Sequence, residues 1–481
     1  MKIIGQSKSF PFWILSLSAV FALIISQLVQ DGMFMDGMIY VTVSRNLAEG
    51  VGTFWDPYFS ATLMTSYHEQ PPLYFGLLAI FFKIFGTSMY VERLFSLACL
   101  ATTSYYMHLF WKKLFIQTKE IAQHSWIPVL FYAITPVCFW AYTNHVEETV
   151  MAIFATMASY YVYCALFLKE RQVLYLILGG FFVFLSGLTK GVQGMFPIAA
   201  VGIYWLVSKE ISFGKMILWT FILIGVPLCI LGVLWFSNED VPASFISYYH
   251  DRYVPTFTNE MDTTGNRFDI LIKVFLELLP IAIITGIILI LSRKFVKQDV
   301  KPSHFSKSIY WLILLGLSGT VPLMVTLEQR GFYVVTAMPL FVLAVSMYAA
   351  PRVTTIIHQI KSTKILTISM IAIYLGSIIF CYAQLGKFKR NENTLTDIYS
   401  LRKYVPENSI VGFPSQMHSE WAFQAYMMRY NKNSLQDNCS NCEFFVIYKN
   451  LDRNLVPSNY TKIDLTTQSF DIYRLNKNLS K

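Results

Sequence analysis

Charged side chains are scarce in this chain of 481 residues. Asp, Glu, Lys and Arg make up only 14% of it, whereas hydrophobic residues make up 55% and aromatic residues 16%. Soluble domains carry roughly 25% charged residues, so the composition excludes an ordinary soluble protein. With a mean hydropathy of +0.47 and several long apolar stretches, the chain is predicted to be a polytopic membrane protein.

Three other features are missing from the sequence. No small-x-small cleavage site follows the apolar stretch at about residues 10–30, so we expect this stretch to persist as a first membrane helix. The net charge of +9 is not gathered in one patch, which argues against nucleic acid as a partner. No clear internal repeat is present, although many transporters are built from repeats.

The apolar stretches predict about eleven transmembrane helices. Lysine and arginine gather in alternate loops between them, so the positive-inside rule places these loops and the N-terminus in the cytoplasm. The remaining loops, which hold the acidic clusters, then lie on the exported face. The predicted helices centre near residues 20, 100, 135, 157, 180, 200, 226, 280, 318, 340 and 373.

A polar loop, residues 31–72, follows the first predicted helix on the exported face. It contains DGMFMDGMIY (31–40) and all but the last residue of HEQPPL (68–73). The next apolar segment, 73–85, has only about thirteen residues. The chain must cross the membrane an even number of times between residue 31 and the helix that starts near residue 90, so 73–85 is predicted to be a non-spanning or re-entrant helix. Three acids of the loop are expected to be solvated charges: Asp31, Glu49 and Asp56.

The last part of the chain, 387–481, is polar and is predicted to form a small exported α/β domain after the membrane domain 1–386. Its period-two runs at 409–413, 443–448 and 460–474 predict strands, and 419–430 predicts a helix. It also contains the sequence CSNC. In an oxidising compartment Cys439 and Cys442 are expected to form a disulfide or to be free thiols.

Lys190, in GLTKGVQG, breaks the positive-inside pattern because it falls on the predicted exported face. It either snorkels to the lipid headgroups or binds a phosphate, since flanking glycines let the backbone approach a ligand closely. Arg252 and Arg330 share this face and are candidates to help. Arg93, near a helix start, is expected to be structural.

Acidic residues supply the other candidates. Glu147 and Glu148, in TNHVEETV, occupy a short turn between two predicted helices, where they are either site residues or helix-end charges. Glu69 and His250 are candidate ligands of a divalent metal ion. The signal is weak, because one glutamate and one histidine far apart in sequence do not make a recognisable metal-binding motif.

Five segments together resemble a known family. They are DGMIY with RNLAEG (36–50), EQPPLYFGLLAIFFKIFG (69–86), ERLFS (92–96), GLTKG (187–191) and RGFYVVTAMP (330–339). In this order they are similar to the bacterial branch of the protein O-mannosyltransferase superfamily, which includes the aminoarabinose transferases of lipid A. The resemblance implies a membrane glycosyltransferase with the GT-C fold.

The resemblance also implies roles for individual residues. Asp36 matches the catalytic aspartate and would act as general base on the acceptor hydroxyl. Lys190 matches the lysine of the KG motif and, with Arg252, would stabilise the leaving phosphate. Further positions match residues that face the site: Tyr40, Tyr333 and one of Glu147 and Glu148.

The chain departs from the family pattern at two positions. Gly37 stands where many relatives have a second acid, and Gln70 stands where lipid A transferases have a lysine near the donor phosphate. The second departure removes a cation and weakens the lipid A assignment.

The predicted function is sugar transfer from a polyprenyl-phosphate donor to an acceptor hydroxyl on the exported face of the bacterial inner membrane. The acceptor would be a protein, lipid A or another envelope glycan. The alternatives are a transporter and a flippase of lipid-linked sugars, both of which would also need membrane helices and polar residues.

Overall fold

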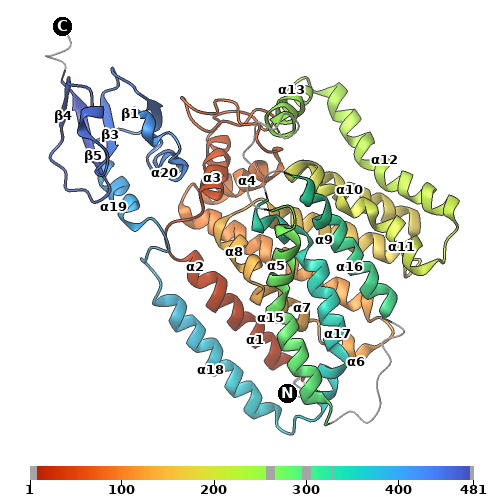
Figure 1. The fold of residues 1–481 in the computed structure, drawn as a ribbon. Coiled ribbons are helices and arrows are strands. Elements are labelled where there is room, and N and C mark those ends of the chain that lie inside the picture. The colour runs from red at the N-terminus through yellow and green to blue at the C-terminus, as the bar shows by residue number, and fades with distance from the viewer. Residues whose placement is uncertain (1–7, 256–265, 295–304, 327–328, 477–481) are drawn as a thin grey trace.

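The structure is a computed structural model that describes residues 8–255, 266–294, 305–326 and 329–476. Most of these residues form a bundle of long helices, and a small β-sheet lies at one end of the bundle (Figure 1). This is the predicted arrangement of a polytopic helical region followed by a small C-terminal α/β unit.

Eight helical stretches among the described residues are long and apolar enough to cross a membrane. A ninth arises if α7 (Trp126–Ile134) and α8 (Pro136–Asn144) count as one span, bent by 72°. Proline at the start of α8 explains the bend, because the residue before a proline avoids helical geometry. The eight stretches are Phe10–Leu28, Glu148–Leu166, Gln172–Ser208, Phe213–Ser237, Asp269–Ser292, Ser306–Val325, Gly331–His358 and Thr363–Tyr382.

These stretches contain most of the helices in Figure 1. Their elements are α1 (Phe10–Val20), η1 (Phe21–Ile25), α2 (Ser26–Leu28), α9 (Glu148–Leu166), α10 (Gln172–Lys190), η2 (Gly191–Ala199), α11 (Ala200–Ser208), α12 (Phe213–Ser237), α15 (Asp269–Ser292), α16 (Ser306–Thr320), η5 (Val321–Val325), η6 (Gly331–Ala337), α17 (Met338–His358) and α18 (Thr363–Tyr382).

The count of eight or nine differs from the predicted eleven for two reasons. Helix α5 (Met89–Leu114) has 26 residues, but serine, threonine, tyrosine and histidine in its central part make it less apolar than the eight stretches. The stretch Gln172–Ser208 contains a reversal. A Cβ on Gly194 would lie 2.3 Å from the Ser186 carbonyl oxygen, whereas residues eight apart in a straight helix are separated by about 12 Å. The chain therefore turns back along the end of α10 where η2 begins.

Burial separates the inner helices from the outer ones. In the apolar window of Gly331–His358, 89% of residues are buried, and in that of Glu148–Leu166, 78% are buried. For α12 and α18 the share is only 17% each. The outer helices thus expose isoleucine, leucine and phenylalanine, as expected where lipid replaces water as the solvent.

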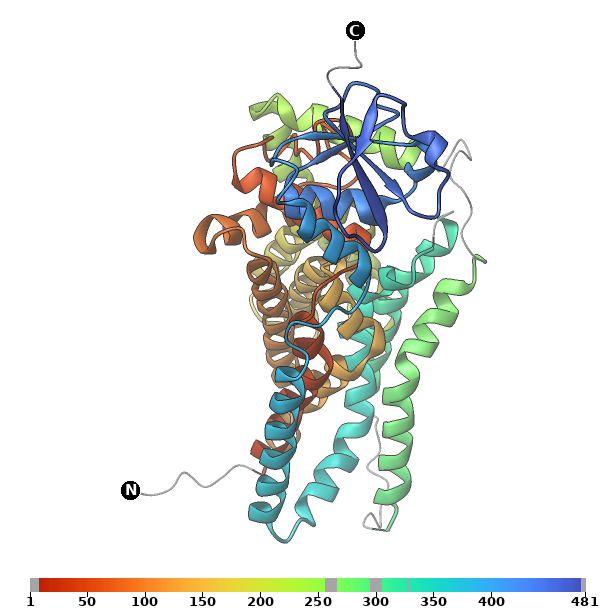
Figure 2. The ribbon, with the colours of Figure 1, turned by 90° about the vertical axis from the view of Figure 1, so that its left-hand side faces the viewer.

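The two ends of the bundle are distinct. Lys8 Nζ donates to the His358 carbonyl at 3.4 Å, so the chain start and the end of α17 lie at one end. The opposite end holds α3 (Met35–Ala48), α13 (Asp240–Tyr248) and the sheet (Figure 2). The charge pattern predicted this separation of the N-terminus from the first loop.

Helix α4 (Leu73–Phe85) lies at the same end as α3 and packs against α3 and α5. It has 13 residues, fewer than a membrane span requires. This fits the predicted non-spanning helix.

The C-terminal unit contains α19 (Glu392–Leu401), α20 (Trp421–Asn431) and a five-stranded sheet in the order β2-β1-β3-β5-β4. The first three strands are parallel, and β3, β5 and β4 are antiparallel. The predicted strand 460–474 is in fact two strands, and β2 has no alternation that would predict it. The strands are β1 (Ile410–Phe413), β2 (Ser434–Asp437), β3 (Phe444–Tyr448), β4 (Tyr460–Lys462) and β5 (Phe470–Leu475).

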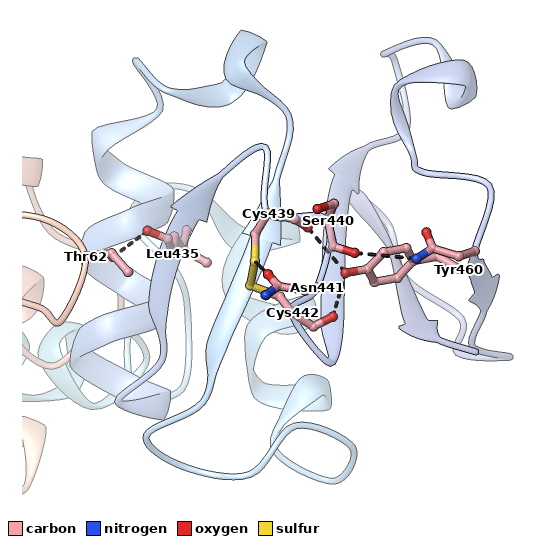
Figure 3. Close-up of a disulfide and its surroundings, with 8 residues drawn as sticks. Thr62, Leu435, Cys439, Ser440, Asn441, Cys442 and Tyr460 are labelled. Atoms are coloured by element: carbon pink, nitrogen blue, oxygen red, sulfur yellow. Dashed lines mark hydrogen bonds between the residues drawn. A yellow bond between two sulfur atoms is a disulfide. The ribbon is translucent and has the colours of Figure 1, made fainter. Parts of the chain in front are cut away.

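A disulfide joins Cys439 and Cys442 just after β2, so the first of the two predicted states is confirmed (Figure 3). The Tyr460 hydroxyl closes the turn by donating to the Cys442 carbonyl at 2.5 Å. Nearby, Thr62 Oγ1 donates to the Leu435 carbonyl at 2.6 Å. The first loop is thereby attached to the C-terminal unit.

Asp31 is not the solvated charge that the sequence suggested. Its carboxylate accepts hydrogen bonds from the hydroxyls of Tyr399 and Tyr430, the latter at 2.9 Å, and lies 3.9 Å from Arg93. The prediction failed because both tyrosines come from the C-terminal unit, far away in sequence. Arg93 has the structural role expected of it, whereas Asp56 is exposed as predicted.

Candidate active site

Two adjoining cavities lie where α3, the first loop, η2 and η6 meet. The smaller, of about 230 Å³, is called here the polar cavity. The larger, of about 1000 Å³, is called the apolar groove and is lined mainly by aliphatic residues of η2, α11, α16 and η5. Four residues line both: Gln70, Lys190, Arg252 and Tyr333.

The polar cavity collects most of the residues singled out from the sequence. It is lined by seven of them: Asp36, Tyr40, Glu69, Gln70, Lys190, Arg252 and Tyr333. These side chains come from α3, the loop before α4, the end of α10, η3 (Tyr249–Tyr253) and η6. Arg330, the other basic candidate of this face, lines the cavity as well.

Lys190 is buried at the boundary of the two cavities. Its Nζ lies 2.5 Å from Oε1 of Glu148 and 5.0 Å from the centre of the Tyr333 ring. Burying a lone ammonium would be very costly, so the carboxylate and the ring face make its position possible. Lys190 does not snorkel to the surface. Glu148 acts by holding it in place.

Gly191 explains why the lysine is followed by glycine. Its φ is 68°, a region that favours glycine, and a Cβ there would lie 2.3 Å from the Tyr248 hydroxyl. The glycine therefore lets α13 pack against the end of α10, whereas the sequence suggested close approach to a ligand. This contact brings the segment that carries Arg252 beside Lys190.

Asp36 lies in the first turn of α3, where the helix dipole favours a negative charge. The start of α3 is fixed by Asn144, whose Oδ1 accepts from the Phe34 amide at 3.0 Å. A Cβ on Gly37 would lie 1.9 Å from the Asn144 carbonyl oxygen. No side chain fits at this position, where the resemblance would suggest a second acid.

Glu147 is fully buried and does not line the polar cavity. Among the described residues neither of its carboxylate oxygens has a hydrogen-bond partner. Burial raises the pKa of Glu147 well above its usual value, and the charge of Lys190 opposes this shift only in part. Both ring nitrogens of the neighbouring His145 likewise have no partner in the described part of the chain, and burial lowers the pKa of this imidazole. His145 belongs to the same TNHVEETV turn, but no site role was predicted for it from the sequence.

Aromatic rings pack against one another at the wall of the polar cavity. Tyr40 packs against Tyr74 with ring centres 5.9 Å apart, and the Tyr74 hydroxyl donates to the His145 carbonyl at 2.9 Å. Burial, with a further contribution from Glu147, raises the pKa of Tyr40 well above its usual value. The Tyr67 phenol shows the same shift from burial. Both therefore remain neutral hydroxyls.

Several lining residues were not identified from the sequence. Met64 lies in the irregular first loop, and its backbone φ of 48° is uncommon for a residue other than glycine. Trp421 comes from α20 of the C-terminal unit. Neither stands in a motif, so only the tertiary structure identifies them. The others are Met35, Ile39 and Tyr67.

The proposed metal ligands are not brought together in the same way. Glu69 lines the polar cavity, but His250 is exposed and lines neither cavity. Within the described ranges, no group of three or more His, Cys, Asp or Glu residues is placed to hold a metal ion. This donor set does not fit a divalent cation, so no chemical step is assigned to one.

Comparison with known proteins gives a family match and a shared fold. Residues 69–235 match the family described as "Dolichyl-phosphate-mannose-protein mannosyltransferase". The segment includes Glu69, Gln70, Glu147, Glu148 and Lys190. No protein of curated function matches the chain significantly.

The fold is similar to that of solved structures over nearly the whole chain. ArnT from Cupriavidus metallidurans, bound to undecaprenyl phosphate, is 13% identical with a TM-score of 0.65, over 96% of this chain and 97% of that one. Its apo state gives the same TM-score at 12% identity, with the same coverage. The oligosaccharyltransferase of Archaeoglobus fulgidus, in the apo form, is 13% identical with a TM-score of 0.51, over 95% of this chain and 74% of that one.

Proposed function

We propose that this chain is a membrane glycosyltransferase with the GT-C fold that transfers a sugar from a polyprenyl-phosphate donor to an acceptor hydroxyl, a proposal supported by the family match over residues 69–235 and by the fold shared with ArnT. We place this reaction on the exported face of the bacterial inner membrane. The observation that carries the proposal is the junction of the two cavities, where Lys190 and Arg252 line both.

The donor has three parts that match three parts of the site. A polyprenyl chain suits the apolar groove, whose lining includes Phe196 and Leu317. The phosphate then lies at the junction, where two cations face it. The sugar extends into the polar cavity toward Asp36. ArnT, which shares the fold, has been crystallised with undecaprenyl phosphate.

The reaction is a single displacement. Asp36 accepts the proton of the acceptor hydroxyl as the acceptor oxygen bonds to the anomeric carbon. The bond from that carbon to the phosphate oxygen breaks, and its electron pair leaves with the lipid phosphate. Lys190 and Arg252 stabilise this added charge in a site partly closed to water. The anomeric configuration is inverted.

Glu148 contributes indirectly. Its contact of 2.5 Å fixes the position of the Lys190 ammonium before the donor binds, so little reorganisation is needed during the reaction. The acceptor is left open to protein hydroxyls, lipid A and other envelope glycans. Gln70 at the junction supplies no charge, which disfavours lipid A.

The transporter and flippase alternatives gain no specific support. A transporter binds its substrate near the middle of the membrane. The polar cavity here is lined by α3 and α20, and both lie at the end of the bundle near α13 (Figure 1).

The proposal is tested with the purified full chain in lipid vesicles. It is incubated with undecaprenyl-phosphate donors carrying a radiolabelled neutral hexose, neutral pentose or amino sugar, together with peptides, lipid A or envelope glycolipids as acceptors. We expect the label to move from one donor to one class of acceptor. Movement of an intact donor across the vesicle membrane without transfer would contradict the proposal and favour the flippase.

A further inference from the structure

The C-terminal unit reaches the polar cavity through one side chain, Trp421. This residue is the first of α20 and is half-buried. It lines the polar cavity but not the apolar groove. Trp421 is therefore placed on the sugar side of the junction and away from the polyprenyl chain.

Helix α20 is held firmly against α3, the helix that carries Asp36. The Tyr426 hydroxyl donates to the Met33 carbonyl at 2.9 Å and accepts from the Met33 amide at 3.2 Å. Arg45, fully buried, donates to the Met428 carbonyl at 2.9 Å. These contacts fix α20 relative to the start and the end of α3. The position of Trp421 relative to Asp36 is thus set by the fold.

A salt bridge attaches α20 to a second helix. Arg429 Nη2 lies 2.5 Å from Oε2 of Glu92, which belongs to α5, and both side chains are buried. A buried pair of this kind is costly to break. Trp421 consequently forms a fixed wall of the cavity.

Among the described residues that line the polar cavity, Trp421 has the most open aromatic surface. Tyr40, Tyr67 and Tyr333 are at most 9% exposed, so their rings are committed to packing. Cations, carboxylates and amides supply much of the remaining wall. Such groups bind sugar hydroxyls, whereas an indole face attracts the C–H groups on the apolar face of a sugar ring.

The size of the cavity favours one ring. Its volume of about 230 Å³ is below the roughly 300–1000 Å³ of sites for drug-sized ligands. Whatever the acceptor, the transferred sugar must lie between Asp36 and the phosphate. Asp36 acts on the attacking hydroxyl, the phosphate is the leaving group, and both bonds are made to the same carbon of the sugar. The sugar of the donor is thus the substrate group that Trp421 meets.

We propose that Trp421 stacks on the ring of the transferred sugar and so determines the affinity for the sugar-bearing donor. The proposal rests on the proposed function and adds a specificity-determining residue that belongs to the C-terminal unit. The polyprenyl phosphate itself would bind without the help of Trp421.

The test compares two ligands with two variants and a control. Affinities of the full chain in detergent are measured for undecaprenyl phosphate and for the undecaprenyl-phosphate sugar that supports transfer. Trp421→Ala removes the ring, and Trp421→Phe keeps an aromatic face. His418→Ala is the matched control, because His418 is exposed, its ring lies 6.1 Å from that of Trp421, and it lines neither cavity.

We expect Trp421→Ala to weaken binding of the sugar-bearing donor roughly tenfold and to raise its KM in proportion. Binding of undecaprenyl phosphate stays within about twofold, and Trp421→Phe recovers most of the loss. Equal weakening of both ligands, or of neither, would overturn the inference. If the unaltered chain neither binds nor uses any sugar-bearing donor, the proposed function itself fails, a result that does not depend on any Trp421 variant.

Discussion

The polar cavity and the apolar groove share a boundary but are built in different ways. The groove is formed largely by two local structures, the η2–α11 segment and the α16–η5 segment. The polar cavity combines residues from six parts of the chain, including one from the C-terminal unit. A binding surface for a lipid chain needs only packed aliphatic side chains, whereas chemistry needs charges at fixed positions. The difference predicts that substitutions in the two cavities will change different measurable quantities.

Replacing Lys190, which lines both cavities, is expected to have the largest effect. Lys190→Met removes a cation from the phosphate position and leaves the buried Glu148 carboxylate without its ion pair. Breaking a buried pair from one side costs about 3–5 kcal/mol. Thermal unfolding should show this loss, and both undecaprenyl phosphate binding and transfer should fall.

The double variant Lys190→Met with Glu148→Met separates the two effects. We expect it to recover much of the stability, because neither charge of the pair remains, but not the affinity for undecaprenyl phosphate. Full affinity in the double variant would show that the phosphate does not bind at the junction.

The second-largest effect is expected from a substitution in α3, which forms one wall of the polar cavity. Gly37→Ala places a Cβ within 1.9 Å of the Asn144 carbonyl oxygen, so the start of α3 must shift together with Asp36. The expected cost in stability is about 1–3 kcal/mol, and transfer should fall more than lipid binding does.

Gly214→Ala is the control for this substitution, since nothing lies within 4 Å of a Cβ at that helical position. Alanine there should stabilise slightly, by at most about 1 kcal/mol. If both alanine variants had the same stability and activity, the close approach of α3 to Asn144 would be wrong.

The smallest effect should come from narrowing the groove. Ala199→Trp is expected to raise the KM for an undecaprenyl donor several-fold and to leave kcat nearly unchanged, because only binding common to ground and transition states is lost. A donor with a short isoprenoid chain should show almost no change. Gly202→Trp, three residues further along in α11 and outside the groove, serves as control. A similar KM change for both chain lengths would argue against the groove as the lipid site.

The sequence predicted the polar cavity far better than the groove. Asp36, Lys190 and Tyr333 were identifiable because polar residues stand out in an apolar chain and belonged to motifs. Ile198 and Leu314 of the groove look like any lipid-facing residue, since aliphatic side chains carry no sign of what they contact.

Long-range contacts account for the other differences. Asp31 was expected to be solvated because its partners, Tyr399 and Tyr430, follow hundreds of residues later. Trp421 was missed for the same reason. The helix count differs for local reasons: the reversal near Gly191 and the polar side chains of α5 explain why the structure gives eight or nine apolar stretches, although eleven were predicted.

The central claim, that Asp36 performs the chemistry while the junction and the groove hold the lipid phosphate, is tested most directly by Asp36→Asn. Affinity for undecaprenyl phosphate and the rate of single-turnover transfer are measured for this variant and for a control, Asp56→Asn, which changes an exposed acid of the same loop that lines neither cavity. We predict that Asp36→Asn slows transfer by about 10²–10⁴-fold with undecaprenyl phosphate affinity within about twofold, and that Asp56→Asn changes neither. Transfer by Asp36→Asn at nearly the unaltered rate would contradict the account.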